Sequence, residues 1–304
     1  MKKLFIFGLG SLTGSKLAIF ARKNYEVFGT YNLRNPFIES IHSIKFDINK
    51  MNLQEILREI KPAIIVNSIA INNVDYCENN KNEAKKINSE FVNELTKTAS
   101  QIGSELIHLS SDSVFDGKKN NPYTENDLPN PINFYGSTKL EAEKFVLENS
   151  NNLIIRVSIL YGWLMKTLRN KISSSMKPSN FEQWFIEKLQ AGEEVKIIRD
   201  ELSSPIIADD FAKTIIYLEK GNYSGIFHAA PEIKISRYDF CLKLARYLKL
   251  DENLISPTAS KELGRKVTTG FNKCLDSTKL KKTEFNFMSL EESFELLKNQ
   301  MLEK

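Results

Sequence analysis

A tyrosine and a lysine stand four residues apart in the segment 135–139, which reads YGSTK. If this segment is helical, the spacing places Tyr135 and Lys139 on one face of the helix. The hydroxyl of a free tyrosine has a pKa of about 10, and a fixed cation beside it lowers that pKa. The pair is therefore typical of a proton donor to a carbonyl group. The spacing alone carries little weight in a chain with 10 tyrosines, so other motifs must support it.

Polar side chains follow several predicted strands at the point where each strand ends. The segment Ser110–Gly117 reads SSDSVFDG and comes after a short apolar run. Ser11, Ser111 and Ser158 each lie just beyond a predicted strand. Because the carboxyl ends of parallel strands meet at one edge of a sheet, we expect these three serines to lie at the same edge.

The turn Gly8–Gly14 joins the first predicted strand to the first predicted helix and reads GLGSLTG. Glycines at this place let the backbone turn tightly and approach a pyrophosphate, whose charge is favoured at the start of a helix. We therefore name Gly8, Gly10 and Gly14 as cofactor-binding candidates. An ordinary tight loop would also use glycines, but the strand before the turn and the helix after it favour a dinucleotide site.

The end of the second predicted strand bears on which dinucleotide binds. An Asp or Glu there would hold the ribose diol of NAD, whereas an arginine accommodates the 2′-phosphate of NADP. Residues 30–34 read TYNLR, with one arginine, Arg34, and no carboxylate. NADP(H) is therefore preferred and NAD(H) is the alternative, while a plain surface charge is the other interpretation of Arg34. Asp47, which follows the third predicted strand, is a further cofactor candidate.

Strands and helices alternate along the first half of the chain. Short apolar runs predict strands at 3–8, 27–31, 43–46, 63–69, 105–109 and 152–157, with helices at 15–24, 52–60, 81–102 and 134–149. Residues 63–69 read AIIVNSI, as expected for a strand buried on both faces. This alternation is typical of right-handed βαβ units. We predict an α/β fold with a doubly wound, Rossmann-like parallel sheet.

The pattern changes after Gly162. A polar and basic stretch, typical of a loop, precedes predicted helices at 181–190, 205–218, 236–248 and 289–300 and strands at 195–198 and 225–229. We predict that residues 1–162 form a dinucleotide-binding domain, with returning segments near 205–229. Residues 163–304 then form a smaller, interleaved substrate-binding region.

The composition is that of an ordinary globular protein. Of 304 residues, 41% are hydrophobic, and the net charge of +4 is small against 42 basic and 38 acidic residues. This balance argues against a nucleic-acid partner.

The cysteines and histidines stand far apart, so no metal site is predicted. No apolar run is long enough for a membrane span, and the first strand begins too early for a signal peptide. We expect a cytoplasmic protein without a membrane partner.

With these motifs in place, the chain resembles the extended short-chain dehydrogenase/reductase superfamily, and within it the dTDP-4-dehydrorhamnose reductase family. The likeness covers nearly the whole length. It rests on VNSIA at 66–70, NVDYCE at 73–78, SSDSVFDG at 110–117, PYTE at 122–125 and YGSTK at 135–139. Several multi-residue matches in a fixed order are more specific than any single motif.

The resemblance implies a role for individual residues. Tyr135 would donate a proton to the substrate carbonyl, Lys139 would orient the nicotinamide ribose and lower the pKa of Tyr135, and Ser111 would hydrogen-bond the carbonyl. The implied reaction is hydride transfer from NAD(P)H to C4 of a 4-keto-6-deoxy nucleotide sugar, in the synthesis of deoxysugars for surface polysaccharide. The further residues expected to line the cofactor are Ser11, Leu12, Ile69, Ala70, Lys139 and Ser158.

Departures from the family pattern concern the substrate. Ser113 stands where the family has a tyrosine, and Ile159 where it often has a tryptophan. Together with Asp112, these are the predicted substrate-binding residues. An aromatic surface selects the shape of a sugar ring, so both changes affect the choice of sugar rather than the reductase chemistry. The Lys/Ser-rich stretch Lys166–Lys177 either covers the diphosphate or is disordered.

Two other functions stay open. An epimerase or dehydratase would share the fold, although a dehydratase usually needs an acidic pair where residues 110–113 supply one acid. The chain also resembles the regulatory β subunit of methionine adenosyltransferase, which binds NADP and serves a partner enzyme without turnover. The intact set of Ser111, Tyr135 and Lys139 favours catalysis. The predicted partner is a small-molecule nucleotide sugar, and a homodimer is possible.

Overall fold

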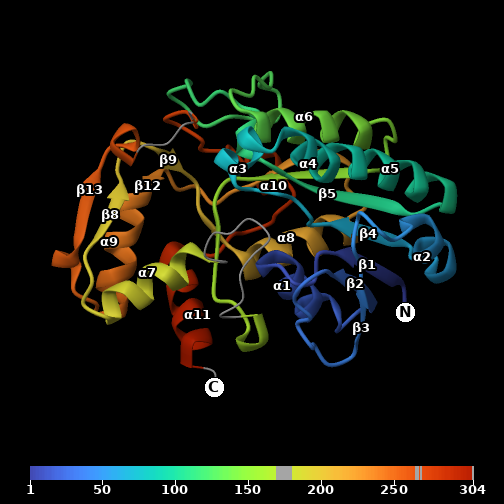
Figure 1. Cartoon of the computed structure of the whole chain (residues 1–304), viewed down its shortest axis with the longest axis horizontal. Coiled ribbons are helices and arrows are strands. Elements are labelled where there is room, and N and C mark those ends of the chain that lie inside the picture. Colours follow the sequence, from blue (N-terminus) through green and yellow to red (C-terminus); the bar gives the residue numbers. More distant parts are fainter. Residues whose placement is uncertain (169–179, 264–266, 268, 303–304) are drawn as a thin grey trace.

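A seven-stranded parallel sheet forms the centre of the molecule (Figure 1). The computed structural model describes residues 1–168, 180–263, 267 and 269–302. The strands run in the order β11-β6-β5-β4-β1-β2-β3, and every pairing between them is parallel. Their bounds are β1 (Lys3–Phe7), β2 (Glu26–Tyr31), β3 (Ile41–Lys45), β4 (Ile64–Asn67), β5 (Glu105–Ser111), β6 (Leu153–Val157) and β11 (Gly225–Ala229).

The strand order confirms the predicted doubly wound fold. From β1 the chain moves outward through β2 and β3, then returns to place β4 on the other side of β1. It continues in the opposite direction through β5, β6 and β11. The direction of winding therefore reverses between β1 and β4. In such sheets ligands bind beyond the carboxyl ends of the strands at this reversal.

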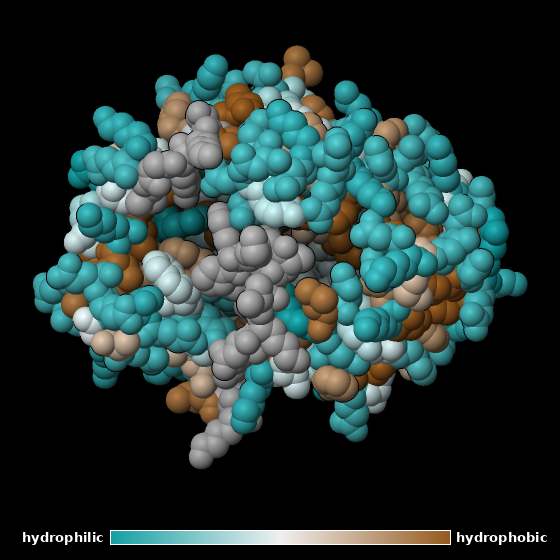
Figure 2. Space-filling model, viewed as in Figure 1, coloured by the Kyte–Doolittle hydropathy of each residue, from teal (hydrophilic) through white to brown (hydrophobic). Residues whose placement is uncertain are grey.

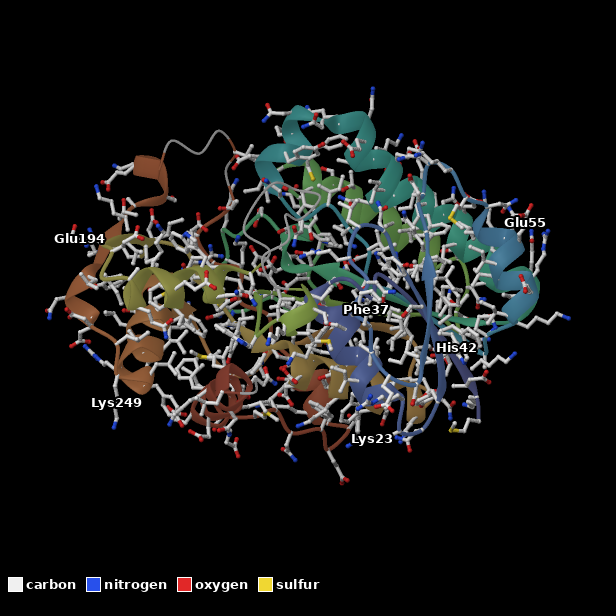
Figure 3. All side chains as sticks on the ribbon, turned by 60° about the horizontal axis from the view of Figure 1, so that its bottom comes forward. Lys23, Phe37, His42, Glu55, Glu194 and Lys249 are labelled. Atoms are coloured by element: carbon white, nitrogen blue, oxygen red, sulfur yellow. The ribbon has the colours of Figure 1, made fainter. Side chains whose placement is uncertain are left out.

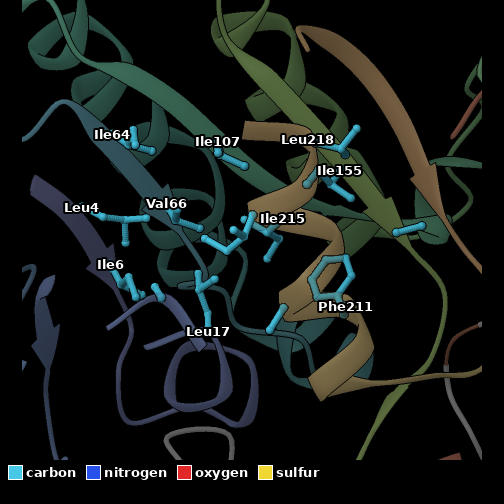
Figure 4. Packing of buried hydrophobic residues seen from close by; sticks show 14 of the residues in the cluster. Leu4, Ile6, Leu17, Ile64, Val66, Ile107, Ile155, Phe211, Ile215 and Leu218 are labelled. Atoms are coloured by element: carbon cyan, nitrogen blue, oxygen red, sulfur yellow. The ribbon is translucent and has the colours of Figure 1, made fainter. Parts of the chain in front are cut away.

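Helices cover both faces of the sheet, because successive residues of a strand point to opposite sides. Leu4 and Ile6 of β1 belong to a core shared with α1 and α8 (Figure 4). Phe5 and Phe7 face the other way and pack with α2, α5 and α6. The bounds of these helices are α1 (Leu12–Ala21), α8 (Ala208–Lys220), α2 (Leu53–Ile60), α5 (Phe91–Ile102) and α6 (Phe134–Val146). Since α8 and β11 come from the second half of the sequence, that half completes the main core.

The long helix predicted at 81–102 is interrupted by a π-helical turn. It runs as α4 (Lys81–Lys85), the π turn η1 (Lys86–Glu90) and α5. Asn88 in this turn is fully buried, donates to the carbonyl of Ile71 and to Oγ1 of Thr138, and accepts from the Ile71 amide. The wider turn brings this side chain inward, where it ties the loop after β4 to α6.

A smaller layer of strands and helices lies beside the sheet, at the left of Figure 1. β8 and β13 pair in parallel there, and α7, α9 and α11 pack around a separate core that contains Phe185, Phe240 and Phe294. The bounds are α7 (Phe181–Gln190), β8 (Val195–Ile198), α9 (Arg237–Leu248), β13 (Ile255–Thr258) and α11 (Leu290–Leu302). The division of the chain at residue 162 stays a prediction.

Short elements connect the two parts. β7 pairs with β10 and β9 pairs with β12. The bounds of these four strands are β7 (Leu160–Tyr161), β9 (Leu202–Ser203), β10 (Ile206–Ile207) and β12 (Ile235–Ser236). The bounds of the remaining short helices are α3 (Val74–Asn79), η2 (Asp112–Val114), η3 (Lys166–Leu168), η4 (Glu252–Leu254), η5 (Ser260–Leu263) and α10 (Thr278–Lys281). Residues 169–177 of the Lys/Ser-rich stretch lie outside the described residues.

The visible face in Figure 2 is mostly hydrophilic, with apolar atoms gathered in scattered patches. None of the helices in the described ranges is both long enough and apolar enough to cross a membrane. Within the same ranges, no three His, Cys, Asp or Glu side chains gather where they could hold a metal ion.

Candidate active site

A cavity of about 250 Å³ lies at the carboxyl edge of the sheet, where β1, β2, β3 and β4 end. Seven of the predicted cofactor residues line it: Gly8, Gly10, Ser11, Arg34, Asp47, Ile69 and Ala70. The other predicted cofactor residues, Leu12, Gly14, Lys139 and Ser158, are not among its lining residues within the described chain. The strand order explains the location, because the ends of β1 and β4 flank the reversal of winding.

The glycine turn after β1 is shaped by two close backbone approaches. A Cβ on Gly10 would lie 2.6 Å from the carbonyl oxygen of Arg34, and one on Gly14 would lie 2.1 Å from that of Gly8. Neither position accepts a larger residue without moving the backbone. α1 begins at Leu12 rather than at the predicted Ser15, because Ser11 caps it and its Oγ accepts from the Gly14 amide at 2.9 Å.

Arg34 gives the cavity a half-buried cation. Its Nη1 is buried without a hydrogen-bond partner among the described residues, and burial lowers the pKa of its guanidinium. A buried polar group without a partner is costly, so such a group signals a missing ligand. A phosphate supplies the charge and the acceptor oxygens that this guanidinium lacks. The glycine turn and Arg34 together fit an NADP-type dinucleotide.

Ser111 and Tyr135 meet beside this cavity. Ser111 ends β5, and Tyr135 lies in the first turn of α6. Asn133 caps that helix through an Oδ1 that accepts from the Gly136 amide at 2.9 Å. A Cβ on Gly136 would lie 2.0 Å from the carbonyl oxygen of Ser113, so the start of α6 rests directly on η2. This contact fixes the tyrosine against the end of β5.

The environment of Tyr135 differs from the expectation. The side chain is buried, and burial is the main cause that raises the pKa of its hydroxyl above the ordinary value. A hydrogen bond with Ser111 opposes this rise, while Asp112 and Cys77 add to it. Burial therefore outweighs the lowering expected from Lys139, whose amine is turned toward β5. That Lys139 lowers this pKa stays a prediction.

Lys139 lies one helical turn after Tyr135 on the buried face of α6, as the spacing predicted. Its Nζ donates to the carbonyl of Leu109 at 2.7 Å and lies 2.9 Å from Nε2 of His108. Burial lowers the pKa of Lys139 to about 8, and Glu143 opposes that shift. Glu143 itself is held by Arg156 at 2.7 Å.

Asp112 joins three serines that were predicted to have different roles, Ser111 in catalysis, Ser113 in substrate binding and Ser158 in cofactor binding. Its Oδ1 accepts from Ser111 at 3.0 Å and from Ser113 at 3.1 Å, and its Oδ2 accepts from Ser158 at 2.7 Å. The carboxylate thereby ties the ends of β5 and β6 together. The structure places Ser158, which was predicted to contact the cofactor, in this network. Ile159 follows directly, and its carbonyl accepts from the Ile206 amide.

The sequence interpretation missed several residues of this region. Asn67 and His108 lie buried between the cavity and Lys139. Each stands at or near the end of a predicted strand, which is the signal that could have identified it. The further cavity residues that were not predicted are Thr30, Tyr31, Asn32, Leu33, Phe46, Ile48, Asn49, Ser68, Ile71, Glu83 and Ile87.

Comparisons with known proteins agree with this geometry. The family model described as "RmlD substrate binding domain" matches residues 1–302. A probable low-salt glycan biosynthesis reductase, Agl14 of Haloferax volcanii, is 30% identical over 90% of this chain and 89% of its own length. The β subunit of methionine adenosyltransferase 2 from Bos taurus is 29% identical over 84% of this chain and 75% of its own. The structure of dTDP-4-dehydrorhamnose reductase from Bacillus anthracis, a complex with NADP, is 26% identical with a TM-score of 0.82, covering 99% of this chain and all of that one.

Proposed function

The chain belongs to the RmlD substrate binding domain family, and from this premise we propose that it is an NADP(H)-dependent reductase of a nucleotide-linked 4-keto-6-deoxy sugar. The observation that carries the proposal is the meeting of Ser111 and Tyr135 at the sheet edge, beside a cavity that contains a glycine turn and Arg34, whose Nη1 has no partner among the described residues. A reductase of a keto sugar needs these two features together.

In the proposed site the cofactor spans the carboxyl edge of the sheet. Gly8, Gly10 and Ser11 hold its pyrophosphate at the start of α1, and Arg34 pairs with the 2′-phosphate. The remaining cofactor residues of the proposal are Leu12, Gly14, Asp47, Ile69, Ala70, Lys139 and Ser158. NAD(H) is the second choice, since β2 ends without a carboxylate. When bound, the nicotinamide supplies the hydride.

Ser111 and Tyr135 act on the substrate carbonyl in this proposal. Because burial raises the pKa of Tyr135, its phenol stays protonated at neutral pH and is ready to donate. The Ser111 hydroxyl, which donates to Asp112 in this structure, turns to donate to the substrate oxygen on which negative charge develops. Asp112, which binds Ser111, Ser113 and Ser158, fixes this edge of the site, and Ile159 lies next to it.

Mixing the protein with NADPH and a panel of nucleotide-linked 4-keto-6-deoxy sugars tests the proposal. We expect loss of nicotinamide absorbance with at least one sugar. Ser111→Ala should slow it by about 10²-fold, because one donor to the developing oxyanion is lost. Ser137→Ala is the matched control, since Ser137 is exposed on α6 and its hydroxyl bonds only to the Asn133 carbonyl among the described residues. Tight NADPH binding without turnover of any sugar would contradict the reductase.

That outcome would favour a second candidate, a regulatory subunit that binds NADP and serves a partner enzyme. The similarity to the β subunit of methionine adenosyltransferase 2 supports it. Co-purification with a catalytic subunit of a methionine adenosyltransferase would then be the decisive measurement. A homodimer also stays a prediction, which sedimentation of the purified protein tests.

A further inference from the structure

Three buried side chains form a hydrogen-bonded chain behind the cofactor cavity. Asn67 ends β4, His108 lies in β5, and Lys139 lies in α6. Nδ2 of Asn67 is 3.2 Å from Nδ1 of His108, and Nε2 of His108 is 2.9 Å from Nζ of Lys139. The exposed fractions of the three residues are 0%, 0% and 1%, so water does not compete for these contacts.

The orientation of Asn67 determines which imidazole nitrogen carries hydrogen. Its Oδ1 accepts from the Ile69 amide at 3.1 Å, so the Nδ2 donor faces Nδ1 of His108. Nδ1 must then be the acceptor, and a neutral imidazole carries its hydrogen on Nε2. Burial holds the pKa of His108 well below its ordinary value, which keeps the ring neutral.

The Nε2–H group points at Lys139 and needs a lone pair there. A neutral amine has a lone pair, and it can still donate to the carbonyl of Leu109. An ammonium has none, so it can bond to His108 only if the ring moves its hydrogen to Nδ1. The hydrogen on Nδ1 would then face Nδ2 of Asn67, and the amide would have to turn and release the Ile69 amide.

We propose that Asn67 and His108 form a hydrogen-bond switch that couples the charge of Lys139 to the backbone of Ile69 in the wall of the cofactor cavity. With Lys139 neutral, Asn67 holds Ile69 in place. With Lys139 charged, Asn67 turns toward His108 and the Ile69 amide is free to bind a ligand in the cavity. His108 and Asn67 are positioning residues, and the proposal rests on the proposed function only where the ligand is a dinucleotide.

The charged and titratable groups near Lys139 interact with other partners. Glu143 on the same helix favours the ammonium, but it is held by Arg156 of β6. Tyr135 stays neutral because burial raises its pKa, and Asp112 of η2 and Cys77 of α3 act on that tyrosine. The side chain on β5 that faces Nζ is the neutral His108.

The tautomer of His108 can be observed directly by nitrogen-15 NMR of protein labelled at histidine. The chain has 3 histidines, so His42→Asn and His108→Gln assign the signals. His42 lies exposed on the edge strand β3 (Figure 3) and serves as the control. We expect Nε2–H in the free protein at high pH and a change to Nδ1–H, without a charged ring, as Lys139 gains its proton near pH 8.

Lys139→Met should abolish this pH-dependent change. A wild-type His108 that keeps one tautomer from about pH 6 to pH 9.5, across the range in which Lys139 titrates, would overturn the proposal. This measurement needs neither cofactor nor substrate, so its outcome does not depend on whether the protein is a reductase.

Cofactor affinity supplies the second readout. Asn67→Asp offers acceptors to both Ile69 and His108, so it favours Nδ1–H and the charged Lys139. In wild type, NADPH affinity should fall above pH 8, by up to about tenfold per pH unit for one proton. In Asn67→Asp that fall should be lost, because one carboxylate oxygen holds the Ile69 amide whether Lys139 is charged or neutral. An identical pH profile in the two proteins would contradict the switch, whereas absence of NADPH binding would contradict the proposed function and leave the NMR test intact.

Discussion

At the scale of single residues, the site holds a buried phenol and a buried amine that face different partners. Ser111 acts on the hydroxyl of Tyr135 and lowers its pKa, while Nζ of Lys139 contacts Leu109 and His108. The two side chains share a helix face, yet the phenol keeps a raised pKa. The tyrosine is therefore suited to donate a proton rather than to accept one.

Replacing Tyr135 with phenylalanine should remove the proton donor while the ring still fills its space. We expect turnover of NADPH with a keto sugar to fall by about 10²-fold or more, and NADPH affinity to stay near wild type. Tyr247→Phe is the control, because Tyr247 hydrogen-bonds Glu295 in the smaller layer. Equal activity of Tyr135→Phe and wild type would assign the proton transfer to another group.

Arg34 should decide between the two dinucleotides. In Arg34→Gln the cation at the cavity is gone, so the NADPH dissociation constant should rise by about tenfold or more while that of NADH changes little. Arg58→Gln is the matched control, since Arg58 of α2 is exposed and bonds Gln101 of α5, and neither residue lines the cavity. Titration of both cofactors by fluorescence makes the comparison. Equal losses for NADPH and NADH would remove the basis for preferring NADP.

At the scale of elements, α6 carries two of the proposed catalytic residues, Tyr135 and Lys139, and η2 braces its first turn. Asn133 caps α6 from a buried position, and Gly136 lets the helix lie against the Ser113 carbonyl. Movement of this end by a small distance would separate Tyr135 from Ser111. The cap therefore matters for activity as well as for stability.

Asn133→Ala should lower the free energy of unfolding by about 1 kcal/mol, the usual loss for a helix cap. It should also reduce turnover, because the first turn of α6 loosens. Asn52→Ala is the control, since Asn52 caps α2 in the same way, with its Oδ1 accepting from the Gln54 amide at 2.9 Å. Denaturant unfolding and turnover are measured for both. Similar losses of turnover in the two variants would show that α6 has no special role.

At the scale of the whole molecule, buried carboxyls oppose the stability of the sheet at high pH. Burial, and then the charge of Glu219, raises the pKa of Glu105 to about 7. Glu105 is half-buried, whereas Glu219 is fully buried and bonds Tyr25 and Lys2. Because the unfolded pKa of a glutamate is about 4.3, the folded protein binds more protons than the unfolded chain between these values. The free energy of unfolding should therefore fall as pH rises from about 4 to about 7.

Glu105→Gln should remove this part of the pH dependence. Because solvent screens this half-exposed carboxyl, we expect the variant to gain only on the order of 1 kcal/mol of stability over wild type at pH 8. Its stability profile should also be flatter below pH 7. Glu55→Gln is the control, since Glu55 is exposed on α2 (Figure 3). Denaturant unfolding at several pH values makes the test. A parallel profile in Glu105→Gln and wild type would show that Glu105 keeps an ordinary pKa in the folded protein.

The sequence by itself determined the parallel sheet, the glycine turn and the helix that carries Tyr135 and Lys139. These features follow from local periodicity, from close backbone approach and from the spacing of residues along one helix. The start of α1 was missed by three residues because a serine cap, rather than an apolar periodicity, sets it.

Only the tertiary structure decided which partners these side chains face. Lys139 contacts His108 from another strand, Asp112 gathers hydroxyls from the ends of β5 and β6, and a π turn sends Asn88 to α6. Such contacts join residues far apart in the chain, and buried polar groups take whichever partner the packing brings near. The burial that raises the pKa of Tyr135 is likewise a product of tertiary packing, which no local pattern records.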